Sequence, residues 1–150
     1  MTALLDIWDR IRNLIEKLSC LPPLLTRLTV GLMFVGTGWG KLHNIPKVTE
    51  FFTSLGIPAP GFHAYLVASI EFGCGTLLVL GLLTRLASVP LMCTMVVAII
   101  TAKRAEINEL NDLLGMSEFL LILLLFWLFV EGGGLLSLDK LFSGKLRSKT

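Results

Sequence analysis

Residues 62–83 read FHAYLVASIEFGCGTLLVLGLL, an apolar run that contains a single charged side chain, Glu71. A helix needs ~20 predominantly apolar residues to cross the hydrocarbon core of a bilayer, so this run is long enough to span a membrane. A second apolar run, residues 85–102, follows after a turn too short to leave the membrane surface. We therefore expect the two runs to form a tight helical hairpin.

The composition agrees with a membrane protein. Of the 150 residues, 54% are hydrophobic and 16% are charged. Two further apolar runs, residues 22–42 and 116–130, flank the hairpin, and four spans of ~20 residues would use ~80 residues. We therefore predict an all-α, integral membrane four-helix bundle. A net charge of +2, spread over both ends, offers no basic face to a phosphate backbone, so nucleic-acid binding is not expected.

The segments outside the apolar runs are amphipathic or polar. Residues 1–21 place apolar and charged side chains on opposite faces of a helix, which predicts an N-terminal amphipathic helix on the membrane surface. Residues 43–61 are too rich in proline to span and predict a short helix in the outer loop. The predicted organisation is thus the surface helix, a four-span domain at residues 22–141 and a basic cytoplasmic tail at residues 142–150.

The distribution of basic residues predicts the orientation. With four spans, the two termini and the Arg85 turn share one side, which holds nine of the 13 Lys and Arg residues. The other side holds the remaining four, namely Lys41, Lys47, Lys103 and Arg104. Because short cytoplasmic loops carry an excess of Lys and Arg, we predict a multi-pass membrane protein with cytoplasmic N- and C-termini.

Charged residues inside the apolar runs carry the functional information, because each costs roughly 2.5 to 3.5 kcal/mol at a helix centre. At ~1.5 Å per residue, Glu71 lies ~13 Å from the outer end of its run, near the midplane. Arg27 and Glu131 lie near the inner boundary, and Lys41 and Glu118 lie near the outer one. Depth therefore predicts two ion pairs, Arg27 with Glu131 and Lys41 with Glu118. Glu71 has no partner at its own depth, although a long Arg27 side chain could lean toward it.

Small residues predict where the helices approach closely. Gly36 and Gly40 form a small-xxx-small face, and Cys74 and Gly75 follow Glu71 by three and four positions and so share its face. We expect the glycines of the first two spans to face each other and these four residues to line a cavity between the spans. Glu71 is the candidate catalytic group, as a proton acceptor or hydrogen-bond partner of a quinone or similar ligand. The alternative is a packing and salt-bridge role.

No metal site is predicted. His43 and His63 flank the outer loop, where a solvated or hydrogen-bonded histidine is usual. Met92, Cys93 and Met95 are soft ligands that could bind copper(I), but flexible gap-filling in a helical core is the simpler interpretation. The three cysteines lie far apart without a CxxC pairing, which indicates free thiols.

Several motifs follow one another along the chain: Arg27, GLMFVGTGWGKL (31–42), TEFFTSLGIPAP (49–60), Glu71 with the following FGCG, GLLTRLAS (81–88), Glu118 and GGGLLSLD (132–139). The ordered series covers residues 24–141 and resembles the DoxX family of small four-helix membrane proteins. The resemblance implies the fold, intramembrane Arg27 and Glu71, the Lys41 position and a location in a bacterial or archaeal inner membrane. It also implies quinone redox chemistry, since one relative, DoxD, forms the small subunit of an archaeal thiosulfate:quinone oxidoreductase.

Three functions are compatible with these residues. The first is a small integral membrane subunit of a redox-linked complex of the quinone or sulfur type, in which the Glu71 carboxyl lines an intramembrane ligand pocket. The second is a non-catalytic membrane scaffold or partner protein, and the third is a small lipophile carrier or transporter. The chain has no flavin fingerprint, haem-spaced histidine pair or CxxC, and thus no self-contained catalytic motif. The expected partners are the lipid bilayer and either other protein subunits or further copies of the chain, with a quinone as candidate cofactor.

Overall fold

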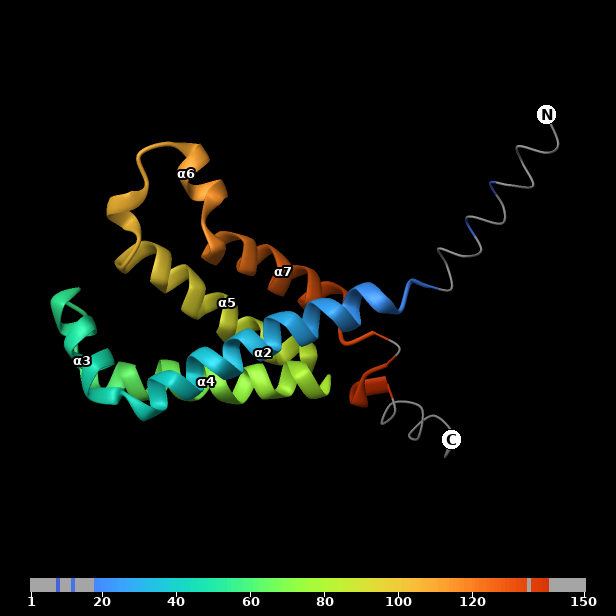
Figure 1. The fold of residues 1–150 in the computed structure, drawn as a ribbon, viewed down its shortest axis with the longest axis horizontal. Coiled ribbons are helices and arrows are strands. Elements are labelled where there is room, and N and C mark those ends of the chain that lie inside the picture. Colours follow the sequence, from blue (N-terminus) through green and yellow to red (C-terminus); the bar gives the residue numbers. More distant parts are fainter. Residues whose placement is uncertain (1–7, 9–11, 13–17, 135, 141–150) are drawn as a thin grey trace.

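The computed structural model of the protein describes residues 8, 12, 18–134 and 136–140, and every regular element within them is a helix (Figure 1). The all-helical prediction is confirmed. Most of the surface helix predicted for residues 1–21 and all of the tail at 142–150 lie outside the described residues. The helices are α2 (Leu21–His43), α3 (Ile45–Ser54), α4 (Pro60–Leu80), α5 (Thr84–Thr101), the 3-10 turn η1 (Arg104–Glu106), α6 (Leu110–Gly115) and α7 (Ser117–Glu131).

Prolines and glycines set the helix boundaries. Proline occupies the first or second position of α2, α3 and α4, where its missing N–H has no partner within the helix to lose. At the end of α4, Gly81 adopts φ +66°, a left-handed conformation that stops the helix. Leu83, at φ +50°, then starts α5. The predicted hairpin of α4 and α5 is therefore present, with a three-residue turn between the helices.

Two helices among the described residues, α4 and α5, are long and apolar enough to cross a membrane. Helix α2 has 23 residues but carries Arg27 and Lys41. Helix α7 has 15 residues and is therefore about 22 Å long, short of the ~30 Å hydrocarbon core. Two of the four predicted spans thus have the length and composition of a span, and the other two lie beside them.

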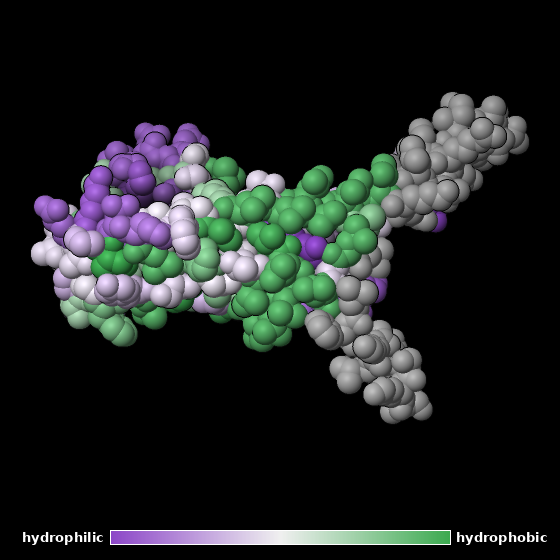
Figure 2. All heavy atoms as spheres, turned by 60° about the horizontal axis from the view of Figure 1, so that its bottom comes forward, coloured by the Kyte–Doolittle hydropathy of each residue, from purple (hydrophilic) through white to green (hydrophobic). Residues whose placement is uncertain are grey.

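The helices are arranged as two pairs. Helix α2 packs along α4, and α5 packs along α7, while the α4–α5 turn joins the pairs. In Figure 1 the pairs lie close together at the end nearest the termini and separate toward α3 and α6. The core at the closed end draws apolar side chains from all four helices: Val30, Phe34, Leu78, Leu91, Leu125 and Leu128. Figure 2 shows hydrophilic residues gathered at the open end, over α3 and α6.

Glycines bring α2 and α4 into backbone contact. A Cβ added to Gly31 would lie 2.9 Å from the carbonyl oxygen of Gly75, and one added to Gly38 would lie 2.4 Å from the backbone nitrogen of Phe72. These distances are too short for any side chain. The predicted glycine contact between the first two spans is confirmed, and it fixes the register of α2 against α4.

The glycines predicted to make this contact were the wrong ones. Gly36 and Gly40 are exposed, and a Cβ on either would meet nothing within 4 Å. Gly31 and Gly38 are separated by two helical turns and lie on the same face as the buried Phe34. Gly36 and Gly40 share a face with each other, as expected for residues four apart, but that face points away from α4.

Helix α6 was not predicted, because its segment is polar and short. Its start is held by Asp112, whose carboxylate accepts hydrogen bonds from the backbone N–H groups of Asn108 and Glu109, both at 3.0 Å. These bonds hold the pKa of Asp112 below its usual value, because they stabilise the ionised carboxylate. The capping orients the chain as it enters α7.

Candidate functional site

A cavity of about 460 Å³ lies where the two helix pairs separate. It is lined from α2, α3, α4, α5 and α7, and its volume falls within the range of small-molecule sites. From α4 the lining residues are His63, Val67 and Glu71, spaced four apart along one face. Most of the wall is apolar and includes Phe34, Val48, Phe51, Phe52, Met95 and Leu121.

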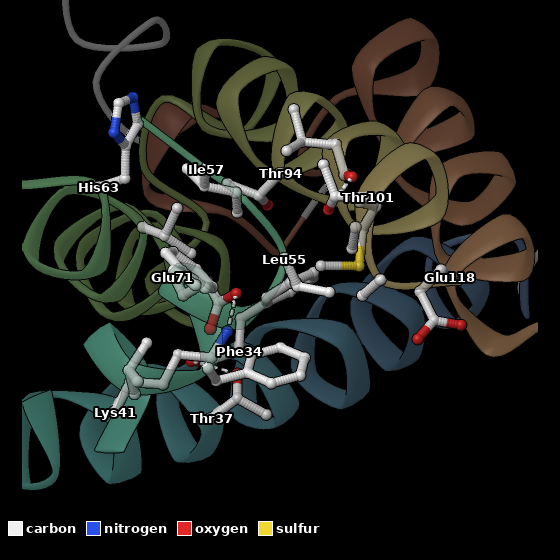
Figure 3. Close-up of a pocket in the computed structure, with 18 of the residues that line it drawn as sticks. Phe34, Thr37, Lys41, Leu55, Ile57, His63, Glu71, Thr94, Thr101 and Glu118 are labelled. Carbon is white, nitrogen blue, oxygen red and sulfur yellow. Dashed lines mark hydrogen bonds and ion pairs between the residues drawn. The ribbon is translucent and has the colours of Figure 1, made fainter. Parts of the chain in front are cut away.

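An ion pair lies at the inner end of this cavity. The Lys41 Nζ atom is 2.5 Å from the Glu71 Oε1 atom, and the two side chains point toward one another in Figure 3. Glu71 is almost fully buried, with 2% of its side chain exposed, whereas 32% of Lys41 is exposed. A buried carboxylate is retained only with such compensation, because transfer of an unpaired charge out of water is expensive.

The second oxygen of Glu71 is unused. The Oε2 atom is buried and accepts no hydrogen bond from any described residue. A carboxylate paired with an ammonium group is a hydrogen-bond acceptor only. Glu71 lines the cavity, so a bound molecule that reached this oxygen would supply the missing donor.

The predicted pairing of Lys41 with Glu118 is wrong, since Lys41 binds Glu71. The prediction placed the outer ends of α2 and α4 at one level. With Gly38 opposite Phe72, however, Lys41 lies beside the middle of α4, and α3 covers the outer half of α4 through Ala64 and Ala68. Helix α2 thus ends deeper than α4 begins, which brings the lysine down to Glu71.

Glu118 lies at the outer rim of the cavity. It is the second residue of α7 and accepts a hydrogen bond from the Ser117 hydroxyl at 3.0 Å. Nearby, Lys103 donates to both carboxylate oxygens of Glu106, at 2.9 and 3.0 Å. These hydrogen bonds and the charge of Glu106 raise the pKa of Lys103, and the charge of Glu118 acts in the same direction. The rim is thus polar and charged, in contrast to the walls.

Arg27 lies at the opposite end of the bundle, away from the cavity. It is buried, with 4% exposed, and its guanidinium donates to the carbonyl oxygens of Gly133, at 2.8 Å, and Leu136. The predicted pair with Glu131 is wrong: Glu131 is exposed and forms no ion pair with a described residue. Arg27 does lie level with the end of α7, as predicted. The chain after α7, however, folds back under the bundle and turns its carbonyls toward Arg27.

Asp139 and Ser137 hold this segment in place. The Asp139 carboxylate accepts hydrogen bonds from the backbone N–H groups of Leu83, at 2.7 Å, and Thr84, at 3.1 Å, and so caps α5. The Arg27 side chain fills the space beside Gly81, where a Cβ would lie 2.0 Å from Nη1. Ser137 is buried and begins a turn in which its hydroxyl accepts a hydrogen bond from the backbone N–H of Lys140. The GGGLLSLD motif signals only that a turn is present.

Four residues predicted to line the pocket do not line the cavity. The backbone of α2 lies against Gly75 and leaves no cavity there, and Cys74 is half-buried and packs against the core. Gly36 and Gly40 face outward. The cavity extends from Glu71 toward the start of α4, whereas the prediction placed it toward the end, where the glycine contact closes the space.

The soft ligands of α5 do not converge. Cys93 is exposed, Met92 packs against the core and Met95 lines the cavity. Within the described part of the chain, no three His, Cys, Asp or Glu side chains gather as a metal site would require.

An apolar helical hairpin that is flanked by two further helices, with an ion pair between α2 and α4, is typical of a small helical membrane protein. The family model described as DoxX matches residues 23–104, more than half of the chain. The chain belongs to the DoxX family of membrane proteins. The resemblance found in the sequence is confirmed.

Three curated relatives are similar to this chain. An uncharacterized membrane protein of Mycobacterium tuberculosis is 42% identical over 94 residues, 62% of this chain and 57% of that protein. A Bacillus subtilis protein named "Putative oxidoreductase CatD" is 36% identical over 125 residues, 81% of this chain and 88% of that protein. The inner membrane protein YqjF of Escherichia coli is 28% identical over 133 residues, 87% of this chain and 98% of that protein. No solved structure matches.

Proposed function

We propose that this chain is a small integral membrane component of a redox-linked assembly and that its cavity binds the head group of a quinone-type lipophile. One observation carries the proposal: the buried Glu71 Oε2 atom lacks a hydrogen-bond donor and lies beside Lys41 at the inner end of an apolar cavity. Ligand sites are typically apolar, with a few polar groups that orient the ligand. The name of the Bacillus relative, which calls that protein an oxidoreductase, further supports the redox assignment.

The proposal includes a membrane arrangement. Helices α2 and α7 pack against the two apolar helices and cross the bilayer with them, so residues 22–141 form a four-span domain with both termini in the cytoplasm. The name of the Escherichia relative supports an inner-membrane location. In this arrangement α3 lies at the outer surface, where Phe51 and Phe52 cover the cavity entrance.

Within this function the chain's own residues bind and orient the ligand. Lys41 donates hydrogen bonds, Glu71 accepts them, and the apolar walls hold the ligand away from water. Electrons pass through a partner subunit. If this chain is instead a scaffold, it will co-purify with a stable partner and bind no quinone.

The test is ligand binding to the purified protein in lipid nanodiscs, titrated with decylubiquinone and, under anaerobic reducing conditions, with decylubiquinol. Val67→Phe places a large side chain in the cavity one turn before Glu71, and we expect it to weaken binding at least tenfold. Val96→Phe is the matched control, because Val96 is 42% exposed and is not part of the cavity wall. Equal binding by both variants would exclude the cavity as the site, and a wild-type protein that binds neither the quinone nor the quinol saturably would refute the function.

A further inference from the structure

We propose that the cavity selects a hydroxyl-bearing head group and therefore binds a lipophilic hydroquinone or phenol in preference to a quinone. The inference rests on the proposed function and specifies which chemical form of the ligand the site accepts. It concerns binding alone and requires no electron transfer.

The first argument comes from Glu71. Its carboxylate is paired with Lys41 through Oε1, and the Oε2 atom is buried without a donor. A quinone carbonyl has only lone pairs, so it would meet the Oε2 lone pairs without forming a bond. A phenolic hydroxyl carries a proton and would donate it into a hydrogen bond at Oε2. Leaving a buried acceptor unsatisfied is the larger cost, so the hydroxyl form is favoured.

The second argument comes from Lys41. Its ammonium group has three N–H donors, and one is directed at Glu71. A hydroxyl oxygen can accept from a second of these donors while its proton goes to Oε2, so one hydroxyl can satisfy both members of the ion pair. A quinone carbonyl can accept only from the lysine. The ion pair is therefore complementary to a group that both donates and accepts.

The third argument concerns the ring. Phe34 is buried and lies next to the Lys41–Glu71 pair in Figure 3, and Phe51 and Phe52 from α3 also line the cavity. Aromatic side chains pair favourably with another ring in offset or edge-to-face geometry. An aromatic hydroxyl thus matches both the polar end and the wall, whereas an aliphatic alcohol matches only the polar end.

The experiment compares ligands that differ only in the donor. The redox-inert pair is 4-nonylphenol and its methyl ether 4-nonylanisole, and the redox pair is decylubiquinol, kept under anaerobic reducing conditions, and decylubiquinone. For protein in nanodiscs we expect the hydroxyl form of each pair to bind roughly ten- to a hundredfold more tightly. Dodecanol, an aliphatic alcohol, tests whether the aromatic ring contributes to the affinity, and we expect it to bind more weakly than 4-nonylphenol.

Glu71→Gln links the preference to the carboxylate. The amide has nearly the same size but can donate as well as accept, so we expect the ratio of affinities within each pair to fall to about twofold or less. Glu131→Gln makes the same chemical change at an exposed position outside the cavity and should leave the ratio unchanged.

The outcomes separate this inference from the proposed function. If the hydroxyl and the capped or oxidised forms bind equally, while Val67→Phe still weakens both, the inference is wrong and the function stands. A preference that persists in Glu71→Gln would likewise overturn the inference. Dodecanol binding as tightly as 4-nonylphenol would exclude the aromatic part of the selection. If no probe binds the wild type, the proposed function itself fails.

Discussion

At the scale of single residues, Arg27 shows how a buried charge is accommodated by backbone carbonyls together with the charge of Asp139. Its guanidinium spans two backbone carbonyls from a segment more than a hundred positions away in the chain. Arginine suits this role because its planar fork presents several donors in a fixed geometry. The side chain therefore fastens the C-terminal segment to the first helix.

Replacing Arg27 with methionine keeps a long side chain but removes every donor. We expect Arg27→Met to lower the free energy of unfolding by about 1–3 kcal/mol, because the carbonyls of Gly133 and Leu136 lose their partners. Thermal unfolding of the helical signal in detergent measures the change. Arg104→Met, at an exposed position in η1, is the control and should leave the midpoint unchanged. An unaltered midpoint for Arg27→Met would contradict the fastening role.

The burial of Arg27 and Glu71 could be predicted from the sequence, because each stands in an apolar run. The partners of these two residues could not be predicted. Pairing by depth assumes that helix ends lie at common levels, and the glycine register shifts α2 inward so that Lys41 reaches Glu71. Arg27 bonds to carbonyls, which every residue carries and which no sequence pattern distinguishes.

At the scale of elements, helix bounds were predictable to within a few residues from hydropathy, proline and glycine. The face that each helix presents to its neighbour was less predictable. Helix α2 contains four glycines, and only the neighbouring helix decides which of them need to lack a side chain. Gly36 and Gly40 match a small-residue motif, yet Gly31 and Gly38 make the contact.

The glycine contact can be tested with a matched pair of substitutions. Gly38→Ala would place a methyl group 2.4 Å from the backbone nitrogen of Phe72, and backbone cannot move aside as a flexible side chain can. We expect a loss of stability of about 1–3 kcal/mol or failure to fold.

The same change at Gly36 meets open space and replaces a poor helix former, so Gly36→Ala should be neutral or slightly stabilising. The measurement is the fraction of monodisperse protein left after heating in detergent. Equal behaviour of the two variants would show that the α2–α4 contact is not as close as described.

At the scale of the whole molecule, the two helix pairs meet at one end and part at the other, which yields a closed base and an open cavity. The polar rim lies at the open end, and the segment after α7 that Arg27 binds lies at the base. The charge bias of the sequence predicts that the base faces the cytoplasm and the rim faces the outside.

Reporter fusions test this orientation. A reporter that is active only in the cytoplasm, fused after Thr150, should be active, and one that is active only outside should report from an insertion near Thr53. The reversed pattern would overturn the orientation, and both sites on one side would contradict the loop assignment. Signals that place the two chain ends on opposite sides would require an odd number of spans.

The long-range fastening of Arg27 also has a consequence for biosynthesis. The first helix of the bundle is made before the others, but the carbonyls that accept from its arginine belong to a segment that follows α7 in the chain. Until that segment has been made, the Arg27 guanidinium lies in an apolar helix without those two acceptors. A message truncated before Gly133 yields a product in which the guanidinium never meets them.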